Sequence, residues 1–188
     1  MVASTASLAP STWIVDPDHS DISFRVRHMG VGRVRGTFTL ASAELAVADD
    51  GTAASSVSAV LDAASVFTGN EQRDRHIRSA DFLDVEIHPI IEFASTQVRD
   101  VHGDSFTVVG DLTIHGVTHT VELAAECLGT VDDPSGGERV GFMATTTISR
   151  TAFGVDIHLG FGAGKVVVAD TIEITIDVEF TSGGAEQS

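Results

Sequence analysis

The last regular segment of the chain, residues 171–180, constrains the fold more than any other stretch. Its large apolar residues alternate strictly with polar ones, and they are Ile172, Ile174, Ile176, Val178 and Phe180. Successive side chains of a β-strand point to opposite faces of a sheet, so a period of two indicates one buried face and one solvated face. This segment therefore predicts a strand that covers an apolar interior.

Earlier parts of the chain repeat the pattern. An opening stretch from Trp13 to His19, in which Asp16-Pro17 predicts a turn, leads into a first strand over residues 20–28. A second strand covers residues 34–47. Its apolar set shifts by one residue, which predicts a β-bulge near residues 41–42.

Five more strands are predicted around residues 57–61, 89–95, 106–114, 117–125 and 142–148. His115-Gly116 predicts a two-residue hairpin turn, which places Leu112 opposite His119. About eight antiparallel strands joined by short turns favour an all-β, eight-stranded, up-and-down barrel, which is just wide enough to hold one slender ligand. A β-sandwich is the alternative architecture. We expect residues 13–181 to form the barrel, with disordered tails at residues 1–12 and 182–188.

One stretch, residues 68–87, departs from the alternation and predicts a short helix between the third and fourth strands. Asn70 can cap a helix that begins at Glu71, whose charge suits the positive end of the helix dipole. Ile77 is its one large apolar residue, and a second turn at Asp81 would present Phe82 and Leu83. We expect this helix to lie across one end of the barrel as a lid.

The charge and composition exclude several partners. The formal net charge of −16 disfavours nucleic acid and anionic membrane surfaces, and no window is apolar enough for a membrane span, so stable membrane insertion is not expected. Residues 1–12 lack the features of a secretory signal, which makes a cytoplasmic location the expectation. The single cysteine, Cys127, falls on the inward face of its strand and predicts a buried, inert thiol. A homodimer is left open.

Eight histidines raise the question of a metal or a catalytic site. His115 and His119 have a spacing that joins two metal ligands on a helix, but the predicted hairpin separates them. His19, Ser20 and Asp21 are adjacent on a strand and point to alternate faces. No Gly-x-Ser-x-Gly turn occurs either. We therefore expect no metal, no cofactor and no catalytic residue.

Five stretches resemble one known family. They are WIVDPDHSDISFRVRH, GRVRGTF, VFTGNEQRDRHIRSADFLDVEIHPIIEF, VVGDLTIHGVTHTVEL and ISRTAFG, and they span nearly all of residues 13–180 in the family's order. The chain thus resembles the YceI-like proteins, lipocalin-like barrels that bind isoprenoids and other long amphiphilic lipids. The resemblance implies a non-enzymatic carrier or store for such a lipid. A scavenger of foreign lipophilic compounds and a small-molecule hydrolase or isomerase that uses rim histidines are the alternatives.

The candidate site consists of the strand residues expected to face the barrel interior, together with residues of the lid. The predicted apolar pocket comprises Phe24, Val26, Phe38, Phe67, Ile77, Phe82, Phe93, Leu112, Phe142 and Phe153. The predicted polar rim comprises His28, Asn70, Arg73 and His76. The phenylalanines could equally form a solid core, so the cavity volume decides between pocket and core. Arg73 and His76 could bind a ligand head group, or with Asp74 they could brace the lid. The glycine-rich segment 150–169, which carries Phe153, Leu159 and Phe161, could cover a barrel mouth or form a loop.

Overall fold

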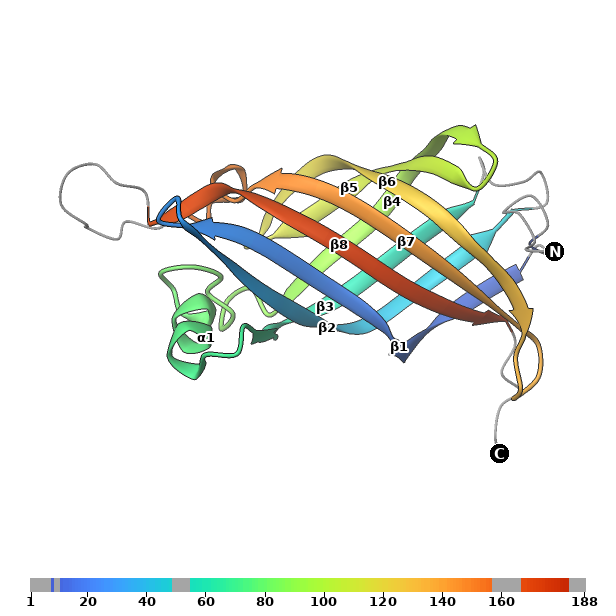
Figure 1. Cartoon of the computed structure of the whole chain (residues 1–188), viewed down its shortest axis with the longest axis horizontal. Helices are drawn as coiled ribbons and strands as arrows, with labels where there is room; N and C mark the ends of the chain where they lie inside the picture. The colour runs from blue at the N-terminus through green and yellow to red at the C-terminus, as the bar shows by residue number, and fades with distance from the viewer. Residues whose placement is uncertain (1–7, 9–10, 49–54, 157–166, 183–188) are drawn as a thin grey trace.

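The computed structural model describes residues 8, 11–48, 55–156 and 167–182, and these fold into a closed antiparallel barrel (Figure 1). Its elements in chain order are β1 (Ser11–His28), β2 (Gly32–Val47), β3 (Ser56–Phe67), α1 (Glu71–Arg78), β4 (Ile90–His102), β5 (Ser105–Ile114), β6 (Val117–Asp132), β7 (Glu138–Ser149), η3 (Thr151–Phe153) and β8 (Val168–Ser182). Each strand pairs with its neighbours in sequence, and β1 pairs with β8 to close the ring. The predicted eight-stranded barrel is therefore confirmed, since every strand pairs with a neighbour on both sides.

Most of the predicted register is confirmed. The ladder between β2 and β3 shifts between Leu40 and Ser42, where the bulge was expected. In the β5–β6 hairpin, Ile114 pairs with Val117 and Leu112 pairs with His119. Both findings follow from apolar parity, because a slip of one residue would move a whole buried set to the solvated face.

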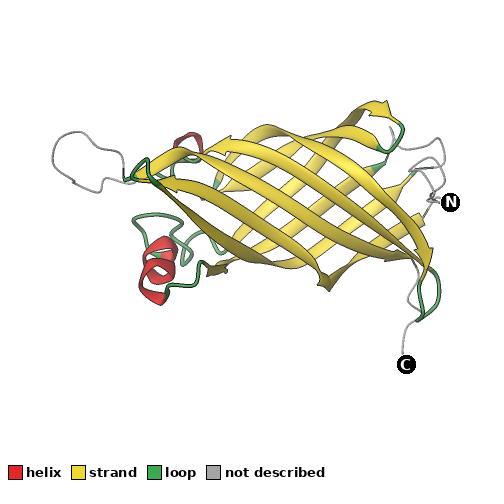
Figure 2. Ribbon diagram, in the orientation of Figure 1, coloured by secondary structure: helices red, strands yellow, loops and turns green. Residues whose placement is uncertain are grey.

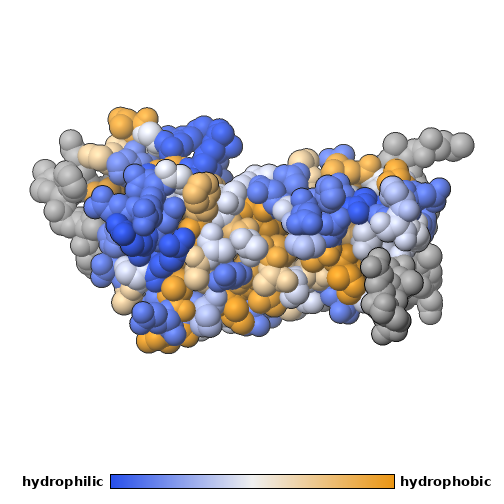
Figure 3. Space-filling model, turned by 90° about the horizontal axis from the view of Figure 1, so that it is seen from below, coloured by the Kyte–Doolittle hydropathy of each residue, from blue (hydrophilic) through white to orange (hydrophobic). Residues whose placement is uncertain are grey.

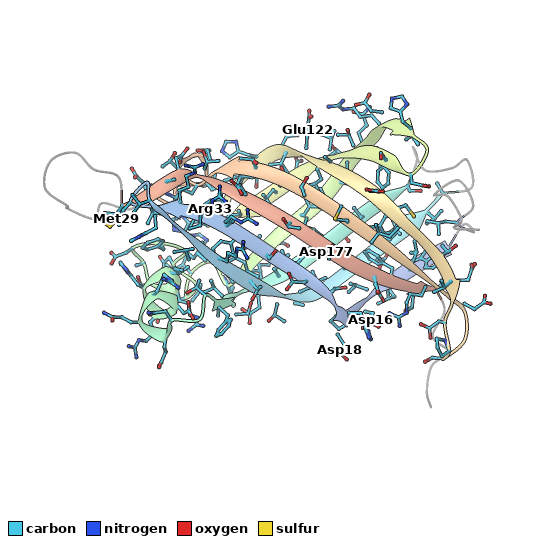
Figure 4. All side chains as sticks on the ribbon, viewed as in Figure 1. Asp16, Asp18, Met29, Arg33, Glu122 and Asp177 are labelled. Atoms are coloured by element: carbon cyan, nitrogen blue, oxygen red, sulfur yellow. The ribbon has the colours of Figure 1, made fainter. Side chains whose placement is uncertain are left out.

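The start of the barrel differs from the prediction. Asp16-Pro17 is not a turn before the first strand, because β1 runs without interruption from Ser11 to His28. The strand instead bends there, and its ladder with β8 shifts register between Asp16 and Asp21 (Figure 4). Proline has no N–H to donate, so a strand tolerates it at such an irregularity. The barrel thus includes residues 11, 12 and 182. The rest of the predicted tails, apart from Leu8, lie outside the described residues.

The helix forms where it was predicted. The side chain of Asn70 accepts a hydrogen bond from the backbone N–H of Arg73 at 3.0 Å, and α1 begins at Glu71. The backbone N–H of Ser79 donates to the carbonyl of His76 and ends the helix after two turns. No helix in the described part of the chain has the length and apolar character needed to cross a membrane.

The two ends of the barrel are built differently (Figure 2). We call one the lid end: it carries α1, η3, the β1–β2 turn at Met29 and the β5–β6 turn at His115. We call the other the terminal end, where β1 begins and β8 ends. On the face seen from below, α1 presents a hydrophilic surface beside a barrel wall of mixed character (Figure 3). The lid end therefore carries short elements added to the sheet, which the terminal end lacks among the described residues.

Candidate functional site

An apolar cavity of about 360 Å³ occupies the interior of the barrel. This volume falls within the range of pockets that bind small ligands. Nine of the ten residues predicted for the apolar pocket line it: Phe24, Val26, Phe38, Ile77, Phe82, Phe93, Leu112, Phe142 and Phe153. The cavity extends from Leu8 and Val47 toward the terminal end to Phe82 and Phe153 at the lid end. The inward phenylalanines are thus cavity wall, although their contact with a ligand stays a prediction.

Two glycines keep aromatic rings close to the barrel wall. A Cβ at Gly36 would lie 2.5 Å from the ring of Phe24, which faces it on the neighbouring strand. A Cβ at Gly110 would lie 2.4 Å from the ring of Phe93. Because neither glycine has a side chain, each ring can lie over the neighbouring backbone, and less of it projects into the cavity.

The prediction for Phe67 is wrong. Its side chain is 63% exposed, whereas its neighbour Val66 is fully buried. The β2–β3 ladder passes from Thr37 opposite Phe67 to Thr39 opposite Asp62, so several residues of β3 form an irregularity between the two pairs. This irregularity breaks the period of two that projected Phe67 inward from Leu61.

Charged side chains meet the cavity at the lid end. Among the described residues that line it, Arg73 and Arg150 carry formal charges, and His28 lies in the same lining. Arg150 was not among the predicted site residues. The signal for it was its place in the ISRTAFG stretch, at the start of the segment for which a cover over a mouth and a loop were the two alternatives.

Arg73 braces the start of the lid through Thr68. Its Nε donates to Thr68 Oγ1 at 2.7 Å and its Nη2 donates to the Thr68 carbonyl at 2.9 Å. The carboxylate of Asp74, only 3% exposed, accepts hydrogen bonds from the backbone N–H and the hydroxyl of Thr68. Asp74 therefore meets Thr68 and not an arginine, because its burial on α1 directs it toward the preceding loop. A guanidinium has five N–H donors, so Arg73 retains three for another acceptor.

The other rim residues also hold the lid. Asn70 caps α1, and His76 Nε2 lies 3.3 Å from Asp81 Oδ2 with its ring edge-on to Phe82 at 4.8 Å between centroids. His76 thus meets a carboxylate of the turn that follows α1. Arg78 donates to the carbonyls of Ala64 at 2.6 Å and Val66 at 2.8 Å, which ties the end of α1 to β3. Asn70 and His76 do not line the cavity.

The short helix η3 closes the mouth on the other side. Arg150 donates from its three guanidinium nitrogens to the carbonyls of Val155, Val168 and Ala169. These bonds hold Phe153, 2% exposed, against the cavity. The start of segment 150–169 therefore covers a mouth, whereas Leu159 and Phe161 lie outside the described residues.

Among the described residues, the histidines and the cysteine form no joint site. His115 packs against His88 with ring centroids 4.7 Å apart, while His119 packs against Phe153 at 5.1 Å, so the predicted separation of His115 and His119 is confirmed. Across the described ranges, no group of three or more His, Cys, Asp or Glu side chains is placed to hold a metal ion. Cys127 is buried as predicted, and burial raises the pKa of its thiol, which keeps it protonated.

Comparisons with known proteins agree with this geometry. A family model described as the YceI-like domain matches residues 13–180. A UPF0312 protein of Vibrio vulnificus (strain YJ016) is 38% identical over 139 residues, which cover 74% of each chain. The crystal structure of BcnA from Burkholderia cenocepacia superposes with a TM-score of 0.74 at 24% identity, covering 88% of this chain and 98% of that one. A domain from Saccharophagus degradans, described as polyisoprenoid-binding and implicated in plant cell wall breakdown, superposes with a TM-score of 0.66 at 15% identity, covering 93% and 100%.

Proposed function

The chain belongs to the YceI-like family, and from that premise we propose that it binds a long-chain amphiphilic lipid of the polyisoprenoid class inside its barrel. One observation carries the proposal: an apolar cavity runs along the barrel, and its charged lining residues lie at the lid end. Such a cavity suits a slender apolar tail with its polar end toward the lid end. The description of the similarly folded Saccharophagus degradans domain supports the same class of ligand.

The tail supplies most of the affinity. Each buried methylene contributes roughly 0.8 kcal/mol, so a five-carbon unit contributes roughly 3–4 kcal/mol before the cost of ordering the ligand. Two or three units outweigh that cost. A head group then determines orientation more than affinity.

The proposed role is carriage or storage without turnover. Among the described residues, neither His76 nor His119 lines the cavity, and His119 bonds a backbone carbonyl, so neither supports a hydrolase or an isomerase acting on a ligand in the interior. A scavenger of foreign lipophilic compounds would use the same cavity and differ only in its ligand. The cytoplasmic location stays a prediction from the sequence, and a homodimer stays open.

A chain-length series tests the proposal. Prenyl alcohols of two, three and four five-carbon units would be titrated into delipidated protein by calorimetry. We expect the affinity to rise with each unit and then to level off when the cavity is full. Equal, weak binding of all three alcohols would contradict binding of the tail inside the barrel.

A further inference from the structure

The wall of the barrel is incomplete between β6 and β7 in its lid-end half. Their ladder begins at the terminal end with Asp132 opposite Glu138 and stops at Ala124 opposite Thr145. Beyond that pair, β6 continues to pair with β5 down to Val117, and β7 continues to pair with β8 up to Ser149. The two strands therefore keep their outer partners and separate from each other.

Two side chains bridge the opening where a ladder would have run. Thr146 Oγ1 donates to the carbonyl of Glu122 at 2.8 Å. His119 Nε2 lies 2.9 Å from the carbonyl of Ala152 and must donate to it, because a carbonyl only accepts. The His119 ring also meets Phe153 edge-on. Single bridges of this kind can break without any loss of sheet pairing.

A groove on the outer surface follows the opening. Four of its lining residues also line the barrel cavity, namely Val121, Thr146, Ile148 and Phe153. The remaining lining residues belong to the groove alone: Thr107, His119, Thr120, Glu122, Ala124, Thr145, Thr147, Ser149 and Ala152. These four residues therefore lie between a polar groove outside and the apolar cavity inside.

The outer part of the groove is rich in hydroxyl groups and has no uncompensated charge. Five of its residues are threonine or serine outside the cavity lining, and Thr145 and Thr147 have no side-chain partner among the described residues. Its one formally charged lining residue, Glu122, projects from the outer face and pairs with Arg99 at 2.7 Å (Figure 4). Hydroxyl groups both donate and accept, which suits an uncharged head group better than a phosphate.

We propose that the groove between β6 and β7 binds an uncharged polar head group, such as an alcohol or an amide, and that the lipid tail enters the barrel through this opening. The inference rests on the proposed function, because it assigns the polar end of the same ligand. It gives the ligand a route that leaves α1 in place. The bridges from His119 and Thr146 keep the opening narrow when no ligand passes.

A disulfide across the opening tests the route. In a Cys127→Ala background, Glu122→Cys with Thr147→Cys would join the separated parts of β6 and β7. Glu126→Cys with Met143→Cys is the matched control, because these two exposed residues face each other on the same strands where the ladder is intact. We expect oxidation to slow the uptake and release of geranylgeraniol at least tenfold in the first protein and to leave the control unchanged. Reduction with dithiothreitol should restore the rate.

A bulky side chain in the groove tests the head-group site and does not depend on disulfide formation. Thr147→Trp fills the groove from a position that does not line the cavity, and Ser58→Trp, on the exposed face of β3, is its control. We expect Thr147→Trp to lower the affinity for geranylgeraniol about tenfold and to leave the affinity for a C20 hydrocarbon without a head group unchanged. Ser58→Trp should change neither affinity.

Three outcomes would overturn parts of this inference, and a fourth would overturn the proposed function. Unchanged exchange across the formed disulfide would overturn the route, and equal effects of Thr147→Trp on the alcohol and the hydrocarbon would overturn the head-group site. A wild-type preference for geranylgeranyl diphosphate over the alcohol would overturn the choice of an uncharged head group. Failure of wild-type protein to bind any of the three probes would instead overturn the proposed function itself.

Discussion

At the terminal end, Arg139 bonds three carboxylates from distant parts of the chain, whereas at the lid end Arg73, Arg78 and Arg150 bond mostly backbone carbonyls. Arg139 lies 2.7 Å from Asp16, 2.8 Å from Asp133 and 2.6 Å from Glu179, and thereby joins β1, the β6–β7 turn, β7 and β8. Arg73 bonds Thr68, which precedes α1, and Arg78 bonds two carbonyls of β3. Arg150 bonds the carbonyl of Val155 and two carbonyls at the start of β8. One arginine ties strands together, and the others hold short segments in place.

This difference between the arginines indicates that the terminal end stays closed, whereas α1 and η3 at the lid end can move away from the barrel. Rupture of the Arg139 cluster would leave three carboxylates close together without their cation. Release of α1 or η3 breaks a few hydrogen bonds but no strand pairing. The least stable parts of a protein are those that open first, and here they are the ones that line the mouth of the cavity.

The largest expected effect is at the terminal end. Arg139→Met should lower the free energy of unfolding by about 3 kcal/mol, because it leaves partly buried carboxylates unpaired. For a chain of this length that corresponds to a fall in Tm of roughly 6–12 °C. Arg99→Met is the control: Arg99 pairs with Asp100 and Glu122 on the surface, so its loss should cost about 1 kcal/mol or less. Equal losses in the two variants would contradict the special role of the cluster.

Acid should weaken the same end. The hydrogen bond from Arg139 lowers the pKa of Asp16 from 3.8 to about 2 in the folded protein. A lowered folded-state pKa means that the stabilisation is present above pH 4 and is lost as the pH falls from about 4 through 2. Thermal unfolding between pH 2 and 6 should therefore show a steeper fall for the wild type than for Asp16→Asn. Parallel curves would show that Asp16 does not contribute.

At the lid end, a truncation should change ligand release more than stability. Phe82 lines the cavity from the turn after α1, so Phe82→Ala removes an apolar contact from the bound tail and should accelerate release of geranylgeraniol about tenfold, whichever opening the ligand leaves by. Its cost in stability should stay below the ~3–5 kcal/mol typical of a core phenylalanine, because Phe82 is only partly buried. Phe67→Ala, an exposed phenylalanine before the same helix, should change neither quantity. If Phe82→Ala unfolded without faster release of the lipid, the turn would belong to the structural core and would not act as a lid.

The smallest expected effect concerns Arg73. Because its hydrogen bonds go to Thr68, Arg73→Ala should cost about 1 kcal/mol of stability and leave the affinity ratio of geranylgeranyl diphosphate to geranylgeraniol unchanged. Titration of both lipids into both proteins measures the ratio. A selective loss of the diphosphate would mean that Arg73 contacts an anionic head group.

The sequence predicted the barrel and most of its cavity for a single physical reason. In a closed barrel the inward face of every strand forms the wall of the interior. The alternation of apolar and polar residues therefore predicts which residues line it, such as Phe24, Phe93 and Phe142. The cap at Asn70 likewise depends on local chemistry that can be read from neighbouring residues. Local patterns were therefore enough for the strands and the lid.

The features that the sequence did not predict depend mostly on the pairing between neighbouring strands. The irregularity in β3 turned Phe67 outward, and the bend at Asp16 let β1 continue through Pro17. The opening between β6 and β7 has no signature in either strand, because each still pairs on its other side and keeps its alternation. The contact of Arg150 with the cavity depends on a loop that folds back over the mouth.

The most direct test of lipid binding inside the barrel compares two neighbouring residues of β3. Ala59 lines the cavity, whereas Ser58 faces solvent. Ala59→Trp, Ser58→Trp and wild-type protein would be purified from the same host and extracted with organic solvent, and the lipid recovered per mole of folded protein would be measured by mass spectrometry. We predict a long-chain lipid from the wild type and from Ser58→Trp, and a loss of at least tenfold from Ala59→Trp. Equal recovery from the two tryptophan variants, or no lipid from wild-type protein that also binds none when it is supplied, would contradict the account.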